Sequence, residues 1–297
     1  MSQSKNMDAE VRKRYSEASK ALSPALCCPV DYNQEYLKVI PKEVIERDYG
    51  CGNPGEFVEK GDHVLDLGSG AGKICFIASQ ITGPEGFVTG VDCNDDMLDL
   101  ANKASAEVFE KTGMKNVKFL RGRIEDLRLK PDWTESYLKD HPIRNCEDLA
   151  NFEFHQERQK SSDPLIQDHQ FDLVVSNCVL NLVATHKKAD LMKEVYRVLK
   201  PGGRAVISDI VSAVRVPKSL QEDPELWSGC ISGAFQEAEF LEAFRVAGFD
   251  QIEILKREET PWQVVQGIEF RSLTVRAGKQ YAPKLQTNGR QSQKSCC

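Results

Sequence analysis

Short apolar runs alternate with amphipathic segments along most of the chain. Runs rich in β-branched and other apolar residues predict buried strands at residues 64–67, 86–91, 117–120, 171–176 and 204–209. Amphipathic segments predict helices at residues 8–22, 74–80, 94–112, 186–199 and 236–247. Two further strands, 251–257 and 268–276, are expected as a C-terminal antiparallel pair. Because strands and helices alternate, the predicted fold class is α/β, with a doubly wound, mostly parallel sheet covered by helices on both faces.

Changes in polarity and proline content divide the chain into parts. We expect an N-terminal helical lid segment, a main α/β domain and a disordered tail, at residues 1–60, 61–277 and 278–297. The charged stretch 128–170 contains helical stretches at 132–139 and 146–160, and is expected to pack on the outside of the sheet as an insertion. Residues 211–235 form a long irregular connection, which in a compact domain is usually a functional loop.

The bulk composition argues against several classes of function. With 45 acidic and 39 basic residues, the net charge is -6, which does not favour a nucleic-acid or anionic-membrane partner. The N-terminus has no apolar signal-peptide core, and no run of roughly eighteen apolar residues occurs, so a cytoplasmic protein is expected. Its ten cysteines are then expected as thiols, and the lack of a C-x-x-C pair argues against a structural zinc site.

The strongest local motif is a glycine turn after the first predicted strand, where residues 63–73 read H-V-L-D-L-G-S-G-A-G-K. Gly68, Gly70 and Gly72 allow the backbone to turn tightly and to lie against a ligand. The N–H groups that open the following helix point to the same place. Strand, turn and helix N-terminus together predict a nucleotide-binding cradle.

The spacing around this turn indicates which nucleotide-like ligand it binds. A dinucleotide-binding G-x-G-x-x-G pattern needs glycine where this chain has Lys73. The pattern D-x-G-x-G-x-G, which begins at Asp66, instead resembles motif I of the class I S-adenosylmethionine methyltransferases. Asp92 ends the next strand, twenty residues after Gly72, where a carboxylate can accept both ribose hydroxyls. The alternative is that Asp92 only caps the helix that begins near Asn94.

A second segment can complete this cofactor site. Residues 123–127, R-I-E-D-L, follow the third predicted strand at the carboxyl edge of the sheet. Ile124 and Glu125 can there hold an adenine ring and its amino group. The alternative is a loop with surface carboxylates.

Three cysteines from separate segments are expected near the same edge of the sheet. Cys178 lies just past the fourth predicted strand, Cys230 lies in the loop 211–235, and Cys51 lies in the turn-rich segment before the first strand. These thiols can therefore converge on one pocket. The alternative for Cys178 and Cys230 is packing in the core, where free cysteine behaves as a small hydrophobic residue.

A cluster of thiols indicates a soft methyl acceptor. Hydroxyl, amine and activated-carbon acceptors need a base or an oxyanion partner and gain nothing from thiols. Trivalent arsenic prefers thiolate ligands and, in a trigonal pyramid, keeps a lone pair that can face a methyl group. Catalysis would then be mostly orientation, without a general base. Cys75, Cys93 and Cys146 lie in or beside regular elements, where free cysteine usually behaves as a small hydrophobic residue, so no thiol chemistry is assigned to them.

Four motifs together resemble the arsenite S-adenosylmethionine methyltransferases: Y-G-C-G, D-L-G-S-G, S-N-C-V-L-N-L-V and W-S-G-C-I-S-G-A, in a match over residues 11–276. The resemblance implies a class I methyltransferase, Rossmann-like sheet, with S-adenosylmethionine as cofactor and arsenite or methylarsenite as substrate. It implies that Cys178 and Cys230 bind As(III). It also implies that Cys51, with Cys28 or Cys27, takes part in arsenic binding and in the disulfide that reduces the pentavalent product.

The motifs and the resemblance together imply a set of cofactor-binding residues, namely Tyr49, Asp66, Gly68, Ser69, Gly70, Gly72, Asp92, Cys93, Ile124, Glu125 and Asn177. The implied partner is a thiol reductant such as thioredoxin or glutathione, and the implied role is arsenic detoxification or organoarsenical biosynthesis. Two alternatives stay open, because a fold alone does not define a substrate. One is methylation of a small organic acceptor such as a quinone or phenol, and the other is a metalloid-binding sensor without turnover.

Overall fold

The computed structural model describes residues 7–20, 30–47 and 49–281. Cys27 and Cys28, the end of the first predicted helix, and nearly all of the predicted tail 278–297 lie outside these ranges. The first helix, α1, spans Met7–Ala18 and therefore ends before residue 22, where the sequence pattern placed its end. Among the described residues, no helix is long and apolar enough to cross a membrane.

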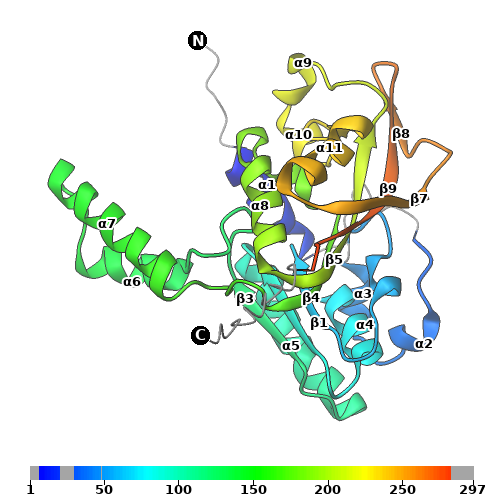
Figure 1. Cartoon of the computed structure of the whole chain (residues 1–297), viewed down its shortest axis with the longest axis horizontal. Coiled ribbons are helices and arrows are strands. Elements are labelled where there is room, and N and C mark those ends of the chain that lie inside the picture. Colours follow the sequence, from blue (N-terminus) through cyan, green and yellow to red (C-terminus); the bar gives the residue numbers. More distant parts are fainter. Residues whose placement is uncertain (1–6, 21–29, 48, 282–297) are drawn as a thin grey trace, which may run out of the picture.

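One mixed sheet forms the centre of the molecule, with the strand order β3-β2-β1-β4-β5-β9-β7 (Figure 1). Its strands are β1 His63–Leu67, β2 Phe87–Asp92, β3 Val117–Arg121, β4 Phe171–Asn177, β5 Leu199–Ser212, β6 Phe235–Gln236, β7 Asp250–Arg257, β8 Gln263–Val265 and β9 Ile268–Gly278. The pairs among β1 to β5 are parallel, whereas β9 runs antiparallel to β5 and β7. The predicted α/β class, including the C-terminal antiparallel pair, is confirmed.

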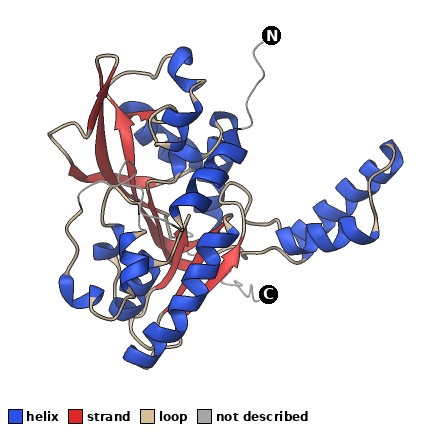
Figure 2. Ribbon diagram, turned by 180° about the vertical axis from the view of Figure 1, so that it is seen from behind, coloured by secondary structure: helices blue, strands red, loops and turns tan. Residues whose placement is uncertain are grey.

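Helices cover both faces of this sheet (Figure 2). Besides α1, they are α2 Gln34–Leu37, α3 Lys42–Glu46, α4 Lys73–Thr82, α5 Asp95–Thr112, α6 Pro131–Asp140, α7 Cys146–Ser162, α8 Lys188–Val198, α9 Lys218–Gln221, α10 Pro224–Ser228 and α11 Glu237–Ala247. Short 3-10 turns lie at η2 Pro54–Phe57, η3 Leu180–Leu182 and η4 Thr185–Lys187. Neighbouring strand residues face opposite sides, so Val64 packs with α4 and α5 while Leu65 packs with α8 and α11.

Two parts of the sequence prediction differ from the fold. Strand β5 is longer than the predicted 204–209, because Leu199 pairs with Phe171 of β4 at one end and the strand pairs with β9 as far as Ser212 at the other. The expected irregular loop 211–235 is partly regular, since it contains α9, α10 and the start of β6. The short strand β8 was also not predicted; its pairing with β9 is a tertiary contact.

The insertion 128–170 forms the two expected helices, but it does not pack on the outside of the sheet. Helices α6 and α7 project from the body as an antiparallel arm (Figures 1 and 2). Helix α6 buries none of its residues and α7 buries only Gln159. The aromatic rings of the arm stack mainly on each other, with Trp133 and Tyr137 centroids 5.1 Å apart. The arm has too few apolar residues to cover a sheet face.

Candidate functional site

The carboxyl ends of β1 and β2 meet at the glycine turn. Gly68 and Gly70 have φ angles of 70° and 51°, the left-handed region that glycine enters without strain. A Cβ on Gly68 would lie 2.4 Å from a methyl group of Val179, whereas a Cβ on Gly70 would meet no atom within 4 Å. One glycine is therefore required by close packing, and the other faces open space where a ligand can lie.

Asp92 lies beside this turn and does more than cap a helix. Its Oδ2 accepts the N–H of Gly70 at 2.8 Å and its Oδ1 accepts the N–H of Asn94 at 2.8 Å. The true N-cap of α5 is Asn94, whose side chain accepts the N–H of Met97. Burial raises the pKa of Asp92, and the two N–H groups oppose that rise. The carboxylate is thus oriented and lies at the edge of a cavity.

The cavity above the turn has a volume of about 420 Å³, within the range of small-molecule sites. It is lined by ten of the eleven cofactor residues expected from the sequence, namely Tyr49, Asp66, Gly68, Ser69, Gly70, Asp92, Cys93, Ile124, Glu125 and Asn177. Gly72 is not among the lining residues; it is the N-cap of α4 and packs under Phe119. The size of the cavity, the open face of Gly70 and the oriented Asp92 carboxylate fit a nucleoside-containing cofactor.

Several of these lining side chains are already engaged by protein groups. Glu125 lies between Arg123 and Lys187, with Nε of Arg123 at 2.7 Å and Nζ of Lys187 at 3.4 Å. Asp66 accepts a hydrogen bond from the thiol of Cys75 at 3.2 Å, and burial raises the pKa of that thiol. Cys75, which received no role from the sequence, therefore supports the floor of the cavity.

Two walls of this cavity were not predicted from the sequence. One is α1, which contributes Val11, Arg12 and Tyr15, and the other is the base of the arm, which contributes Pro131 and Glu135. The amphipathic pattern of α1 predicted a helix but could not show what it covers. The arm base is held beside the cavity by ion pairs from Arg121 to Asp132 and Glu135, which no local pattern reveals.

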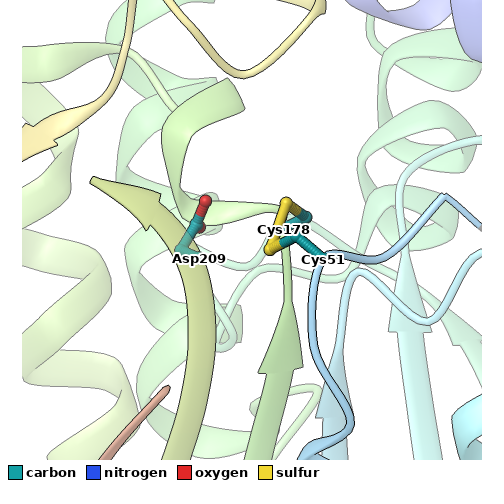
Figure 3. Close-up of side chains that lie close together, drawn as sticks. All are labelled: Cys51, Cys178 and Asp209. Atoms are coloured by element: carbon teal, nitrogen blue, oxygen red, sulfur yellow. A yellow bond between two sulfur atoms is a disulfide. The ribbon is translucent and has the colours of Figure 1, made fainter. Parts of the chain in front are cut away.

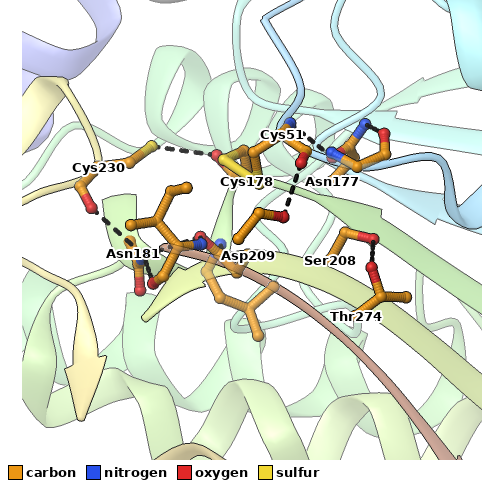
Figure 4. The surroundings of a disulfide bond; sticks show 12 residues. Cys51, Asn177, Cys178, Asn181, Ser208, Asp209, Cys230 and Thr274 are labelled. Carbon is orange, nitrogen blue, oxygen red and sulfur yellow. Dashed lines mark hydrogen bonds between the residues drawn. A yellow bond between two sulfur atoms is a disulfide. The ribbon is translucent and has the colours of Figure 1, made fainter. Parts of the chain in front are cut away.

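At the other end of the cavity, the structure brings the three expected cysteines together: Figure 3 shows Cys51 and Cys178, and Figure 4 also shows Cys230. Cys178 follows β4 and lines the cavity, and Cys51 comes from the segment between α3 and η2. These two form a disulfide with Cα atoms 5.7 Å apart. Cys230 follows α10, and its thiol donates a hydrogen bond to the carbonyl oxygen of Cys178 at 3.3 Å. Each of the three is only 5% exposed.

The disulfide of Cys51 with Cys27 or Cys28 that the family resemblance implied stays a prediction, because both of those cysteines lie outside the described residues. In this structure Cys51 pairs with Cys178. The physical reason is proximity, because a Cα separation of 5.7 Å is the usual span of a disulfide and both backbones are held there. Cys178 is thus one of the expected arsenic ligands and, in this structure, is also one of the two cysteines of the disulfide.

Cys178 and Cys230 both adopt a left-handed backbone, with φ angles of 62° and 63°. This conformation is uncommon for residues other than glycine, asparagine, aspartate and histidine. It costs about 1–3 kcal/mol and persists where the surrounding structure enforces it, which is frequently at functional sites. Nothing in the sequence pattern signals it, and it argues against the alternative that these two cysteines only fill the core.

Asn177 holds the Cys51 segment against Cys178. Its side-chain oxygen accepts the N–H groups of Cys51 and Gly52, each at 3.0 Å, and its amide nitrogen donates to the carbonyl of Gly52 at 2.7 Å. Ser272 on β9 donates to the carbonyl of Cys51 at 2.7 Å. Asn177 was expected as a cofactor residue; it lines the cavity, but its side chain is occupied by this backbone.

A buried carboxylate, missed by the sequence analysis, supports the cysteine loops from below. Asp209 on β5 accepts the N–H of Leu180 at 2.9 Å and the side-chain amide of Asn181 at 2.8 Å. The same amide reaches the carbonyl of Cys230 at 3.3 Å. Burial raises the pKa of Asp209 and lowers the pKa of the nearby Lys188, whose ammonium group is bonded to the carbonyl of Gly233.

Helix α1 connects the two ends of the site. Arg14 donates from Nη1 to the carbonyl of Glu225 at 2.8 Å and to the hydroxyl of Ser228 at 2.7 Å, both on α10. Asn94, at the cofactor end, donates to the carbonyl of Arg12 at 3.2 Å. Burial raises the pKa of Tyr15, and the neighbouring Cys230 adds to that rise. One helix therefore touches both the cofactor end and the Cys230 segment.

Comparison with known proteins places this geometry in a family. A methyltransferase domain model matches residues 58–137 and 132–248, so most of the chain is a methyltransferase domain. The solved structure of an arsenic(III) S-adenosylmethionine methyltransferase from Chlamydomonas reinhardtii is 31% identical, with a TM-score of 0.65 over 88% of this chain and 75% of that chain. The chain belongs to the arsenite methyltransferase family.

Curated relatives agree with this assignment. The arsenite methyltransferase of Mus musculus is 33% identical over 205 residues, which are 68% of this chain and 45% of the relative. That of Aquipseudomonas alcaligenes is 33% identical over 235 residues, which are 78% of this chain and 58% of the relative. The chain thus spans about half the length of the curated relatives it matches. S-adenosylmethionine, the expected cofactor, is the methyl donor of this family.

Proposed function

We propose that this protein transfers a methyl group from S-adenosylmethionine to trivalent arsenic, in the form of arsenite or methylarsenite, held by Cys178, Cys230 and Cys51. The observation that carries the proposal is the pair of buried cysteines in left-handed conformation, Cys178 and Cys230, which come from different segments and meet beside the cofactor cavity. Thiol ligands suit As(III), since soft ligands select soft centres.

In this reaction the protein orients the methyl donor and the arsenic, and it supplies no general acid or base. When bound, S-adenosylmethionine supplies an electrophilic methyl group on a sulfonium centre. Asp92 is oriented to accept the ribose hydroxyls, and Ile124 and Glu125 line the cavity where an adenine would lie. Three thiolate ligands leave arsenic a lone pair that can face the methyl group. Holding the two reactants in such a near-attack arrangement can lower the activation free energy by up to about 7–11 kcal/mol.

The proposed reaction requires a reductant. The Cys51–Cys178 disulfide occupies two of the three proposed arsenic ligands, so two electrons and two protons must first convert it to two thiols. A small thiol such as glutathione, or a dithiol protein such as thioredoxin, is oxidised to a disulfide in that exchange. For this reason we also propose that the protein acts in a reducing compartment, the cytoplasm.

The test is arsenic speciation after incubation with arsenite, S-adenosylmethionine and a thiol reductant. Methylated arsenic is the expected product, and Cys178→Ser or Cys230→Ser should abolish it while cofactor affinity stays nearly unchanged. Cys146→Ser is the matched control, because that cysteine is exposed at the start of helix α7. Full activity of both site variants would overturn the proposal and favour a small organic acceptor such as a quinone or phenol.

A further inference from the structure

Three possible metal-ligand atoms lie close together at the bottom of the site. The sulfurs of Cys51 and Cys178 and a carboxylate oxygen of Asp209 all lie within 4.8 Å of one another, and all three residues are buried (Figure 3). Asp209 is fully buried, at 0% exposure, at the carboxyl edge of the sheet. Cys230 does not belong to this group of atoms.

We propose that, once the disulfide is reduced, Cys51, Cys178 and Asp209 form a second metal site that binds a divalent, thiol-seeking cation such as Zn²⁺ or Cd²⁺. Two sulfurs and one carboxylate oxygen are ligands that such cations accept, and three protein ligands leave a fourth position open. As(III) in the proposed reaction uses thiolates, Cys230 among them. The two occupants therefore share Cys51 and Cys178 and differ in the third ligand, so they exclude each other.

The hydrogen bonds of Asp209 orient its carboxylate. Oδ1 accepts the N–H of Ile210 and the side-chain amide of Asn181, both at 2.8 Å, and Oδ2 accepts the N–H of Leu180. The backbone N–H of Asn181 also donates to this carboxylate. Hydrogen bonds of this kind to a ligating carboxylate fix its direction and are a usual part of metal sites.

The local charge also suits a divalent cation. Two thiolates, one carboxylate and a divalent cation carry one net negative charge. Lys188 is buried near Asp209, and its ammonium group lies 4.0 Å from the centroid of the Phe235 ring. Its positive charge balances the site, so no uncompensated charge is buried when the cation binds.

Reduction of the disulfide comes before cation binding. A phosphine or dithiol breaks the S–S bond and is oxidised, and the two sulfurs become thiols. Cation binding then displaces both thiol protons to the buffer, which is how thiolate metal sites form. The cofactor cavity, which Cys178 lines, gives the cation a path to the buried sulfurs. Only the competition with arsenite rests on the proposed function, whereas cation binding itself does not.

The experiment titrates Cd²⁺ into the phosphine-reduced, chelator-treated protein and follows the sulfur-to-cadmium charge-transfer absorption. Wild type, Cys146→Ser and Cys230→Ser should bind Cd²⁺ alike, while Cys51→Ser and Cys178→Ser should lose the band. Asp209→Asn should weaken binding by at least about tenfold, the scale for removing a unit charge a few Å from the cation. Loss of Cd²⁺ binding in Cys230→Ser, or unchanged Cd²⁺ binding in Asp209→Asn, would overturn the proposal.

Two further measurements distinguish loss of the metal site from loss of folding, and cation binding from arsenite binding. Asp209→Asn can fail to fold, so the cadmium NMR shift of the wild-type protein is measured as well, and it should indicate two sulfur ligands rather than three. Arsenite binding should show the opposite dependence, since it should be lost in Cys230→Ser. Cadmium binding with the expected pattern but no methylated arsenic would refute the proposed function and leave the metal site standing.

Discussion

The side-chain oxygen of Asn177 accepts the backbone N–H of Cys51 at 3.0 Å and thereby ties the segment before β1 to the end of β4. Since Cys178 directly follows Asn177, this one amide fixes the two backbones that bring the sulfurs of Cys51 and Cys178 together. The alignment of the thiol site thus depends on a residue that supplies no sulfur.

Asn177→Ala should therefore lower arsenite affinity. We expect a loss of about 10–100-fold, the range found when a residue that orients metal ligands is removed. Asn177→Asp retains the oxygen that accepts the N–H groups of Cys51 and Gly52, and it should recover much of this loss. Binding is measured on the reduced protein by arsenite titration, with S-adenosylmethionine affinity measured in parallel. A loss confined to cofactor affinity would contradict the positioning role.

Local signals made much of the cofactor end predictable from the sequence. Gly68, Gly70 and Asp92 act through short-range backbone geometry, so their spacing was enough to place them. The edge position of Cys178 also followed from the βα alternation, because the carboxyl ends of parallel strands share one edge of the sheet. These features depend on the order of residues along a few adjacent elements.

The rest depends on contacts between distant segments. From the sequence, Asp209 is predicted only as the last residue of a strand. Its burial near Lys188 and under the cysteine loops results from tertiary contacts. The disulfide pairing of Cys51 followed from backbone proximity across 127 positions of sequence. The left-handed backbone of Cys178 and Cys230 is imposed by tertiary structure on a residue type that does not favour it.

Arg14 on α1 offers a test of the link between the two ends of the site. Arg14→Ala removes the hydrogen bonds to Glu225 and Ser228, which precede Cys230. Each such bond from a charged group contributes about 1.5–3 kcal/mol. We expect weaker arsenite binding and a lower turnover rate, with cofactor affinity changed little. Lys13→Ala, an exposed neighbour on the same helix, should leave both unchanged, and equal effects of the two substitutions would argue against the link.

The outer part of the arm should be dispensable for stability. Tyr137 and His155 face each other across the arm with ring centroids 5.4 Å apart, so a short Gly/Ser linker can replace residues 138–157. Because this part buries no residue, the free energy of unfolding should change by about 0.5 kcal/mol or less. Thermal melting measures this change in stability, and a cofactor-binding titration shows whether the shortened arm affects the cavity.

The base of the arm should behave differently from its outer part. Arg121 lines the cofactor cavity and pairs with Asp132 and Glu135, so Arg121→Ala should raise the KM for S-adenosylmethionine, whereas the shortened arm should not. If shortening the arm raised the KM and Arg121→Ala did not, the proposed contribution of the base would be wrong.

Lys188 and Asp209 are buried groups of opposite charge that attract each other through space, and their effect on stability should depend on pH. Burial raises the pKa of Asp209 above its ordinary value of about 4, so the folded protein holds that proton more tightly than the unfolded chain does. Ionised Asp209 consequently lowers stability above its folded pKa, and the penalty is relieved as the pH falls through that value. Lys188 reduces the penalty by offsetting the negative charge.

Lys188→Met removes this compensation and leaves Asp209 buried without its cation. At neutral pH the free energy of unfolding should fall by about 1–3 kcal/mol, the usual cost of leaving buried polar groups without their partner. The loss should shrink as the pH approaches about 5, because Asp209 then takes up a proton. Adding Asp209→Asn should restore most of the stability at neutral pH. Urea unfolding of the single and double variants at both pH values measures this, and a loss that is the same at both would show that Asp209 is not the group left uncompensated.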